Sequence, residues 1–166
     1  VLSRRYPHFQ TLVQSYEASS YAQAECLMSG LLPLKDGRPV VVFDFTNFGL
    51  HHNGTFEAAK ALLKEACREW SDTFAVGVLA TQDVWDFHNL KNRNLKRYDA
   101  DAADVFAAII RIGQPFDWNA VKRLCLKSPV IAISMLDTIA EDCGSLHNPE
   151  VHEIWDFVAR YTDVIL

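Results

Sequence analysis

A short polar segment, residues 47–55, holds the side chains best suited to chemistry in this 166-residue chain. Its adjacent histidines, His51 and His52, are candidate catalytic groups, because imidazole titrates near neutral pH and can act as a general base or donate a hydrogen bond. The alternative is that they are solvated loop residues. Neighbouring side chains point in different directions on most backbones, so the two do not make a metal site without other ligands. The candidate binding residues of the segment are Asn47, Gly49, Asn53, Gly54 and Thr55.

Gly49 and Gly54 permit a tight backbone in this segment, and Thr55 is expected to cap the helix that follows. The start of that helix would offer free N–H groups and the positive end of its dipole to a phosphate or a sugar hydroxyl. The glycine spacing matches neither G-x-G-x-x-G nor a Walker sequence. As a phosphate motif the segment is therefore weak, and the expectation depends on the helix start.

Two later segments add polar groups. Arg111, close to Gly113, could direct its guanidinium onto a phosphate or carboxylate of a ligand, or it could pair with a surface acid. Asp137 and Thr138 could hydrogen-bond a sugar, or Asp137 could cap the next turn. We take Asp137 as a candidate catalytic residue and the other three as candidate binding residues.

Asp44 is a further acid, inside an apolar run that predicts a strand. A phosphorylated aspartate of the haloacid-dehalogenase type is usually followed by a second aspartate two residues on, and Thr46 occupies that place here. The acidic pair and the lysine of a receiver domain are also missing. We therefore expect Asp44 to be a structural carboxylate that orients a loop.

Apolar runs without alternation alternate with segments of helical period, which predicts an α/β fold with a parallel sheet covered by helices on both faces. In such a sheet, ligands bind beyond the carboxyl ends of the strands, so the polar segments above should meet at one edge. The strands are expected at residues 39–45, 74–80, 105–111, 129–135 and 163–166. Helices are expected at residues 7–32, from 55 to about 70, 84–97, 119–126 and 149–158.

The bulk composition excludes several classes of protein. A net charge of −5 with 22% charged residues gives no electrostatic footprint for nucleic acid or an anionic membrane. Four cysteines without C-x-x-C spacing indicate reduced thiols. No metal is expected, because the aspartates at 99, 101 and 104 lack the rest of an EF-hand and the histidines at 147 and 152 have no cysteine partners. Without a signal peptide or a membrane span, the expected compartment is the cytoplasm.

The chain resembles the N-terminal, acceptor-side domain of two-domain GT-B glycosyltransferases, notably bacterial retaining enzymes. The resemblance covers roughly residues 39–166 and rests on loose, hydrophobic motifs. These are residues 40–45 with the 49–54 loop and its helix, residues 109–113, residues 133–139, the helix at 155–160 and the strand at 163–165. It implies a Rossmann-like domain at residues 39–166, preceded by a helical extension at residues 1–38.

The resemblance also implies a function. The domain would help to transfer a sugar from a nucleotide-sugar donor to a saccharide or lipid-linked acceptor, and the latter is compatible with peripheral membrane association. The donor would bind mainly to a C-terminal domain that is missing here, so the chain alone should be inactive, and no cofactor is implied. The 49–54 loop would approach the donor phosphates or the acceptor, and Asp137 with Thr138 would line the cleft. Leu136 and Asp137 stand where the family often has a histidine.

A different class of function stays open. The chain could be a non-catalytic regulatory or ligand-binding module of flavodoxin-like shape. A small-molecule hydrolase that uses one of the two histidines is a weaker alternative, because no G-x-S-x-G elbow is present. The chain begins without methionine and ends in three apolar residues, so we expect it to be part of something longer.

Overall fold

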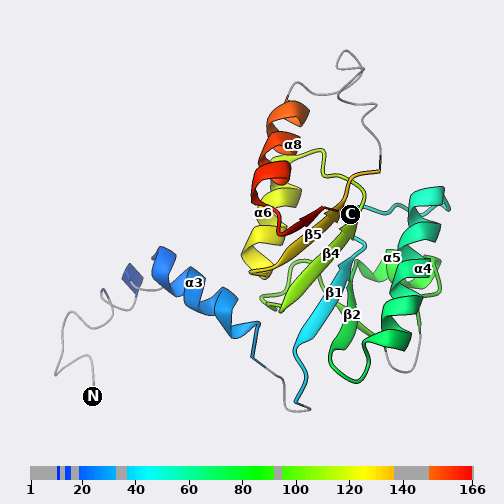
Figure 1. The fold of residues 1–166 in the computed structure, drawn as a ribbon, viewed down its shortest axis with the longest axis horizontal. Coiled ribbons are helices and arrows are strands. Elements are labelled where there is room, and N and C mark those ends of the chain that lie inside the picture. Colours follow the sequence, from blue (N-terminus) through cyan, green and yellow to red (C-terminus); the bar gives the residue numbers. More distant parts are fainter. Residues whose placement is uncertain are drawn as a thin grey trace.

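The computed structural model describes residues 11, 14–15, 19–32, 37–91, 95–136 and 150–165. Helices and strands alternate along most of the chain, as the sequence predicts, but no helix separates the strands at residues 96–98 and 108–112 (Figure 1). In chain order the elements are α3 (Ser20–Ser29), β1 (Val40–Asp44), α4 (Gly54–Glu69), β2 (Ala75–Leu79), α5 (Gln82–Phe87), β3 (Lys96–Tyr98), β4 (Ala108–Ile112), α6 (Trp118–Lys127), β5 (Ile131–Ser134), α8 (Glu150–Tyr161) and β6 (Val164–Ile165).

The strands form one six-stranded sheet in the order β3-β2-β1-β4-β5-β6, and every pair of neighbours is parallel. The chain proceeds from β1 toward one edge, returns to β4 on the other side of β1, and then proceeds toward the opposite edge. This is the strand order of the Rossmann fold, and its topological switch point lies between β1 and β4. The predicted fold class is confirmed.

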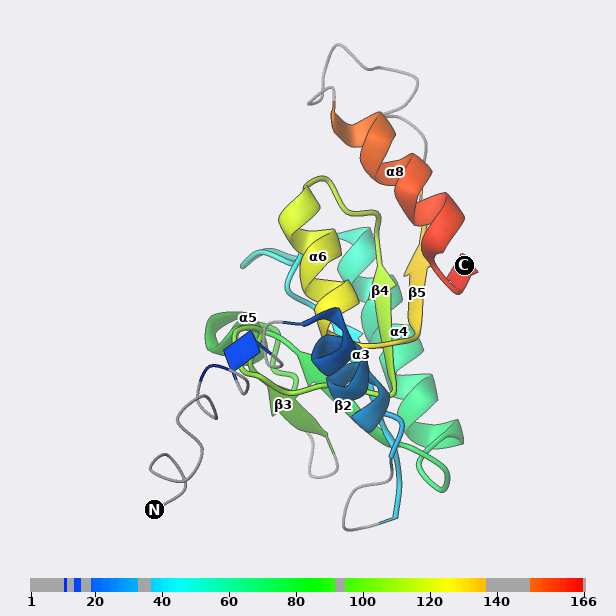
Figure 2. The ribbon, with the colours of Figure 1, turned by 90° about the vertical axis from the view of Figure 1, so that its left-hand side faces the viewer.

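Strand β1 shows why the sheet is covered on both faces. All five of its residues are buried. Val40 and Val42 belong to a core that includes residues of α6 and α8, whereas Val41 and Phe43 belong to a second core that includes residues of α4 and α5. Figure 2 shows α6 on the near side of the sheet and α4 on the far side. An unalternating apolar run is what two covered faces require.

Predicted bounds shift at several elements, and the helix expected at residues 7–32 is described as α3, which begins only at Ser20. Two further differences concern the strands at the β3 side of the sheet and at β4. The third predicted strand begins three residues later, at Ala108, because Phe106 and Ala107 precede it in a connecting segment that is hydrogen-bonded to Lys127 and Val40. The weak helix expected at residues 84–97 is only the six-residue α5, and it is followed by β3, which the sequence does not predict. A three-residue strand rich in charge is too short to show a period.

The N-terminal extension is described in part. Helix α3 is capped by Ser19, buries none of its residues and contacts α6. Its last turn lies against the connecting segment, since a Cβ on Gly30 would stand 2.6 Å from the Phe106 carbonyl oxygen. The division into residues 1–38 and 39–166 stays a prediction. None of the described helices is long and apolar enough to cross a membrane.

The cysteines that the structure describes, Cys26, Cys67 and Cys125, are free thiols. Burial raises the pKa of the Cys67 and Cys125 thiols above the ordinary value. A raised pKa keeps these two thiols protonated and weakly nucleophilic at neutral pH. Cys143 lies outside the described residues.

Gly77 of β2 provides a test of the packing between β2 and β3. A Cβ there would stand 2.6 Å from Cε2 of Tyr98, whose ring packs edge-on against Phe106 at 5.0 Å and has little room to move. We expect Gly77→Val to lower the free energy of unfolding by about 1–3 kcal/mol, measured by chemical denaturation. The control is Gly54→Ala, because an added Cβ there meets nothing within 4 Å. Equal stability of the two variants would contradict this packing.

Candidate functional site

The switch point is built around an ion pair between neighbouring strands. Asp44 and Arg111 are register partners at the carboxyl ends of β1 and β4. Nη1 of Arg111 donates to Asp44 Oδ2 at 2.6 Å. The Arg111 side chain is 5% exposed and that of Asp44 is 0% exposed. By alternation from Val42 and Ile109, both point to the face of the sheet that α6 covers. The sequence analysis left open whether Arg111 binds a ligand or pairs with a surface acid. In the structure its partner is the buried carboxylate of Asp44.

The same carboxylate orients the turn after β1. Oδ1 of Asp44 accepts from the Thr46 backbone N–H at 3.0 Å and from the Thr46 hydroxyl at 2.6 Å. The Thr46 hydroxyl oxygen in turn accepts from Arg123 Nη2 of α6 at 3.0 Å. On the β4 side, Arg111 Nε donates to the Gly113 carbonyl at 3.2 Å. Asp44 thus has the loop-orienting role that the sequence predicts.

Side-chain hydrogen bonds fix both ends of the 47–55 segment. The amide of Asn47 donates to the Ile112 carbonyl at 3.0 Å, which joins the turn after β1 to the end of β4. Asn53 caps α4, because its Oδ1 accepts from the Phe56 N–H at 2.8 Å. The expectation that Thr55 is the cap is wrong. The helix begins at Gly54, two residues earlier than a cap at Thr55 would allow.

His88, which the sequence analysis does not single out, holds the middle of this segment. Its Nε2 lies 2.9 Å from the Gly49 carbonyl, and because a carbonyl only accepts, Nε2 carries the hydrogen. The ring is 2% exposed and stacks on Phe56 with centroids 3.7 Å apart. Nδ1 is buried without a hydrogen-bond partner among the described residues. His88 follows α5, where the sequence shows only a weak helical period, so no sequence signal identified it.

The candidate catalytic histidines lie on the outer side of the segment. His51 is exposed, and its Nε2 lies 3.3 Å from the Asn53 amide nitrogen. The ring of His52 packs against His88 and Phe87, with Nδ1 3.6 Å from Glu57 Oε1. Neither histidine lines the pocket described next. Neither histidine therefore shares this pocket with the other candidate residues, and a role as general base stays a prediction.

A pocket of about 240 Å³ opens at the switch point, and we call it the switch-point pocket. It brings together segments that follow β1, β4 and β5, as the sequence predicts for the carboxyl edge of the sheet. Five candidate residues line it, Asn47, Asn53, Thr55, Arg111 and Gly113, together with Phe48, Gln114, Phe116 and Leu136, which were not candidates. Asp137 and Thr138 lie outside the described residues, directly after the lining residue Leu136 in the chain.

Gly113 is the glycine whose conformation the pocket requires. Its φ is +97°, a region that L side chains rarely adopt. A Cβ there would stand 3.4 Å from the side chains of Asn47 and Thr55, inside the pocket. Neither Gly49 nor Gly54 has a positive φ or lines the pocket. Gly49 is closely packed, since a Cβ there would stand 2.9 Å from the His51 ring, whereas Gly54 has open space around it.

Gln114 closes the edge of the pocket nearest β5. It is 5% exposed, and its Oε1 accepts from the Leu136 N–H at 3.1 Å.

No group of three or more metal-binding side chains gathers anywhere in the described part of the chain. Comparison with protein-family models, curated proteins and solved structures gave no match. The function must therefore be inferred from the arrangement of these residues.

The ion pair can be tested by removing one charge. Asp44→Asn leaves the Arg111 guanidinium buried without a counter-charge, so we expect the free energy of unfolding to fall by about 3–5 kcal/mol in urea denaturation. Replacing both partners, Asp44→Leu with Arg111→Met, should cost less, because no charge is then left unpaired. Asp72→Asn, on the exposed turn after α4, is the control. A single variant as stable as the parent would show that the pair does not constrain the fold.

The hydrogen bond of His88 can be tested with a matched pair of variants. His88→Gln places an amide nitrogen near the position of Nε2 and keeps a donor for the Gly49 carbonyl, whereas His88→Leu fills the space without a donor. We expect the leucine variant to be less stable by about 1 kcal/mol and to exchange the amide hydrogens of residues 49–53 faster. The same exchange rates in both variants would exclude the hydrogen bond as the restraint on this segment.

Proposed function

We propose that this domain is the acceptor-side half of a glycosyltransferase and that the switch-point pocket receives a sugar. The observation that carries the proposal is the lining of the pocket. Neutral hydrogen-bonding side chains, Asn53, Thr55 and Gln114, lie beside the rings of Phe48 and Phe116. Amide and hydroxyl groups match the hydroxyls of a saccharide, and aromatic rings match its apolar faces. The carboxyl-end switch point is where such folds bind their ligands.

The charge in the pocket fits a sugar better than a bound phosphate group. Arg111 is the one ionisable residue among the described lining residues. Its Nε and Nη1 already donate to Gly113 and Asp44. Neither edge of the guanidinium therefore has both nitrogens free to bind a phosphate bidentately. The main phosphate contacts of a nucleotide-sugar would have to come from another part of the enzyme.

The size of the pocket also supports a scheme in which this domain binds the sugar and another part of the enzyme binds the phosphates. Sites for ligands of drug size usually enclose 300–1,000 Å³, and the switch-point pocket encloses about 240 Å³. This space suits one sugar ring and is too small for a whole nucleotide-sugar. A complete site would then form only when a second domain closes over this edge, and Asp137 with Thr138 would enter it from the segment after Leu136.

A non-catalytic binding module is the second candidate function. It is favoured by the absence of any acid, base or thiol among the described residues that line the pocket. A flavodoxin-like shape for such a module is wrong, because flavodoxin-like sheets have the order 2-1-3-4-5 and this sheet has the Rossmann order. The reading frame downstream of this chain separates the two functions. A second α/β half with a basic residue and paired glutamates supports the transferase.

The proposal is tested by titrating the ¹⁵N-labelled protein with a panel of methyl glycosides and with nucleotide-sugars. We expect weak, millimolar binding of a glycoside with shifts at Asn53, Thr55 and Gln114. Thr55→Val should abolish these shifts because it removes the hydroxyl but keeps the shape, whereas Thr55→Ser should retain them. No nucleotide-sugar should bind tightly to this half alone.

Two results would contradict the proposal. Submicromolar binding of a nucleotide-sugar by this domain would overturn the division of labour between the halves. Glycoside shifts that do not depend on the Thr55 hydroxyl, or that lie away from the switch-point pocket, would overturn the assignment of the sugar site.

A further inference from the structure

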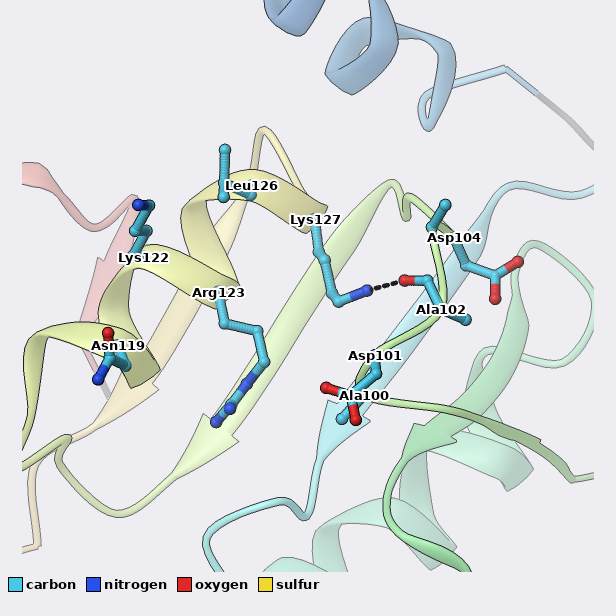
Figure 3. Close-up of a pocket in the computed structure, with 10 residues that line it drawn as sticks. Ala100, Asp101, Ala102, Asp104, Asn119, Lys122, Arg123, Leu126 and Lys127 are labelled. Carbon is cyan, nitrogen blue, oxygen red and sulfur yellow. Dashed lines mark hydrogen bonds between the residues drawn. The ribbon is translucent and has the colours of Figure 1, made fainter.

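A second polar cavity lies on the face of the sheet that α6 covers. It is a groove of about 420 Å³ between α6 and the segment at residues 100–104, which connects β3 to β4. We call it the α6 groove and define it by Asp101, Asp104, Asn119, Lys122, Arg123 and Lys127 (Figure 3). Unlike the switch-point pocket, it reaches the volume typical of small-molecule sites. The two cavities share no lining residue.

One wall of the groove carries positive charge. Lys122, Arg123 and Lys127 all come from α6, and none of them has an ion-pair partner among the described residues. The Lys127 ammonium donates to the Ala102 carbonyl, which holds residues 100–104 against the helix (Figure 3). The other two cations are therefore the ones available to a ligand.

Arg123 belongs to this wall, although its Nε does not face the groove. Its Nη2 donates to the Thr46 hydroxyl at 3.0 Å, which fixes the plane of the guanidinium. Its Nε is buried and has no hydrogen-bond partner among the described residues. A buried donor without a partner is costly, so native proteins usually satisfy it with a side chain, water or ligand. Figure 3 shows the Arg123 side chain extending from α6 across β4.

The opposite wall carries two carboxylates, Asp101 and Asp104, both exposed. Carboxylates accept hydrogen bonds from hydroxyl groups and repel a second anion. A ligand that satisfies both walls has one anionic group for the α6 side and several hydroxyls for the other side. We propose that the α6 groove binds a small polyol bearing one phosphate or carboxylate group, with the anion on Arg123 and Lys122 and the hydroxyls on Asp101 and Asp104.

The groove is connected to the ion pair at the switch point. The guanidinium of Arg123 holds Thr46, which donates to Asp44, which in turn pairs with Arg111. Arg111 lines the switch-point pocket. A ligand that contacts Arg123 should therefore disturb Thr46, the hydrogen-bond partner of Arg123. The chemical shift of the Thr46 amide is thus a probe of binding at the buried end of the groove.

The test uses ¹⁵N-labelled protein at constant ionic strength in a buffer without phosphate. Glycerol 3-phosphate, glycerate, glycerol and inorganic phosphate are titrated separately, so that the phosphate, the carboxylate and the polyol are each examined. We expect saturable shifts of the Arg123 Nε–H, of the amides of residues 100–104 and of Thr46 with at least one anionic polyol. That polyol should bind more tightly than either glycerol or inorganic phosphate.

Substitutions locate the anion. Arg123→Gln should weaken binding about tenfold or more through the loss of a charge-assisted hydrogen bond. Because this change could disturb the fold through Thr46, Lys122→Gln is the second variant, and its exposed side chain should make folding insensitive to the change. Its expected loss is about threefold. Lys64→Gln, exposed on α4, is the matched control and should bind as the parent does.

The proposal is overturned if none of the four compounds gives saturable shifts in the groove, or if glycerol or inorganic phosphate binds as tightly as the best anionic polyol. It is also overturned if the shifts spread over surface lysines, disappear with added salt and are unchanged in Lys122→Gln. A response confined to the switch-point pocket would place the anion site there instead.

Discussion

The carboxyl edge of this sheet depends on one buried ion pair. Asp44 and Arg111 end neighbouring strands at the point where the chain reverses its direction across the sheet. Removing two charges from water costs more than their attraction returns unless other hydrogen bonds complete their shells. Here Thr46 and the Gly113 carbonyl complete them. The pair therefore contributes little net stability as such, but it requires that the turns after β1 and β4 adopt these positions.

The remaining restraints on the 47–55 segment follow from that arrangement. Asn47 donates to the carbonyl of the last residue of β4, Asn53 caps α4, and His88 holds the Gly49 carbonyl from the opposite side. Each bond satisfies a backbone group that a loop would otherwise leave to water. A segment restrained at its start, middle and end presents a shaped wall to a ligand. Less conformational entropy is then lost when the ligand binds.

Two polar cavities flank the ion pair on different sides. The switch-point pocket lies over the ends of β1 and β4 and has a mostly neutral lining, and the α6 groove lies along α6 and is strongly charged. Arg123 and Thr46 connect the second to the first through Asp44. The two linings differ in charge, and we therefore propose different ligands for them, a saccharide in one and an anionic polyol in the other. The same short chain of hydrogen bonds borders both.

What could be predicted from the sequence is what depends on local pattern. The sequence shows an unalternating apolar run at β1, a helical period at α4 and a repeated alternation of strand and helix. These patterns predict a parallel sheet covered on both faces, because a strand that is apolar on both sides must be buried on both sides. That fold places the residues after each strand at one edge, so Asn47, Arg111 and Gly113 could be chosen as candidates before any coordinates.

Other features were decided by contacts between segments far apart in the chain. The partner of Arg111 is 67 residues away, and that of His88 is 39 residues away. No local spacing encodes such pairs, so the sequence could neither find His88 nor choose between the two roles of Arg111. The sequence by itself determined the sheet and the edge where a site forms. Only the tertiary structure decided which polar groups meet there, because that depends on strand order, register and the direction of each side chain.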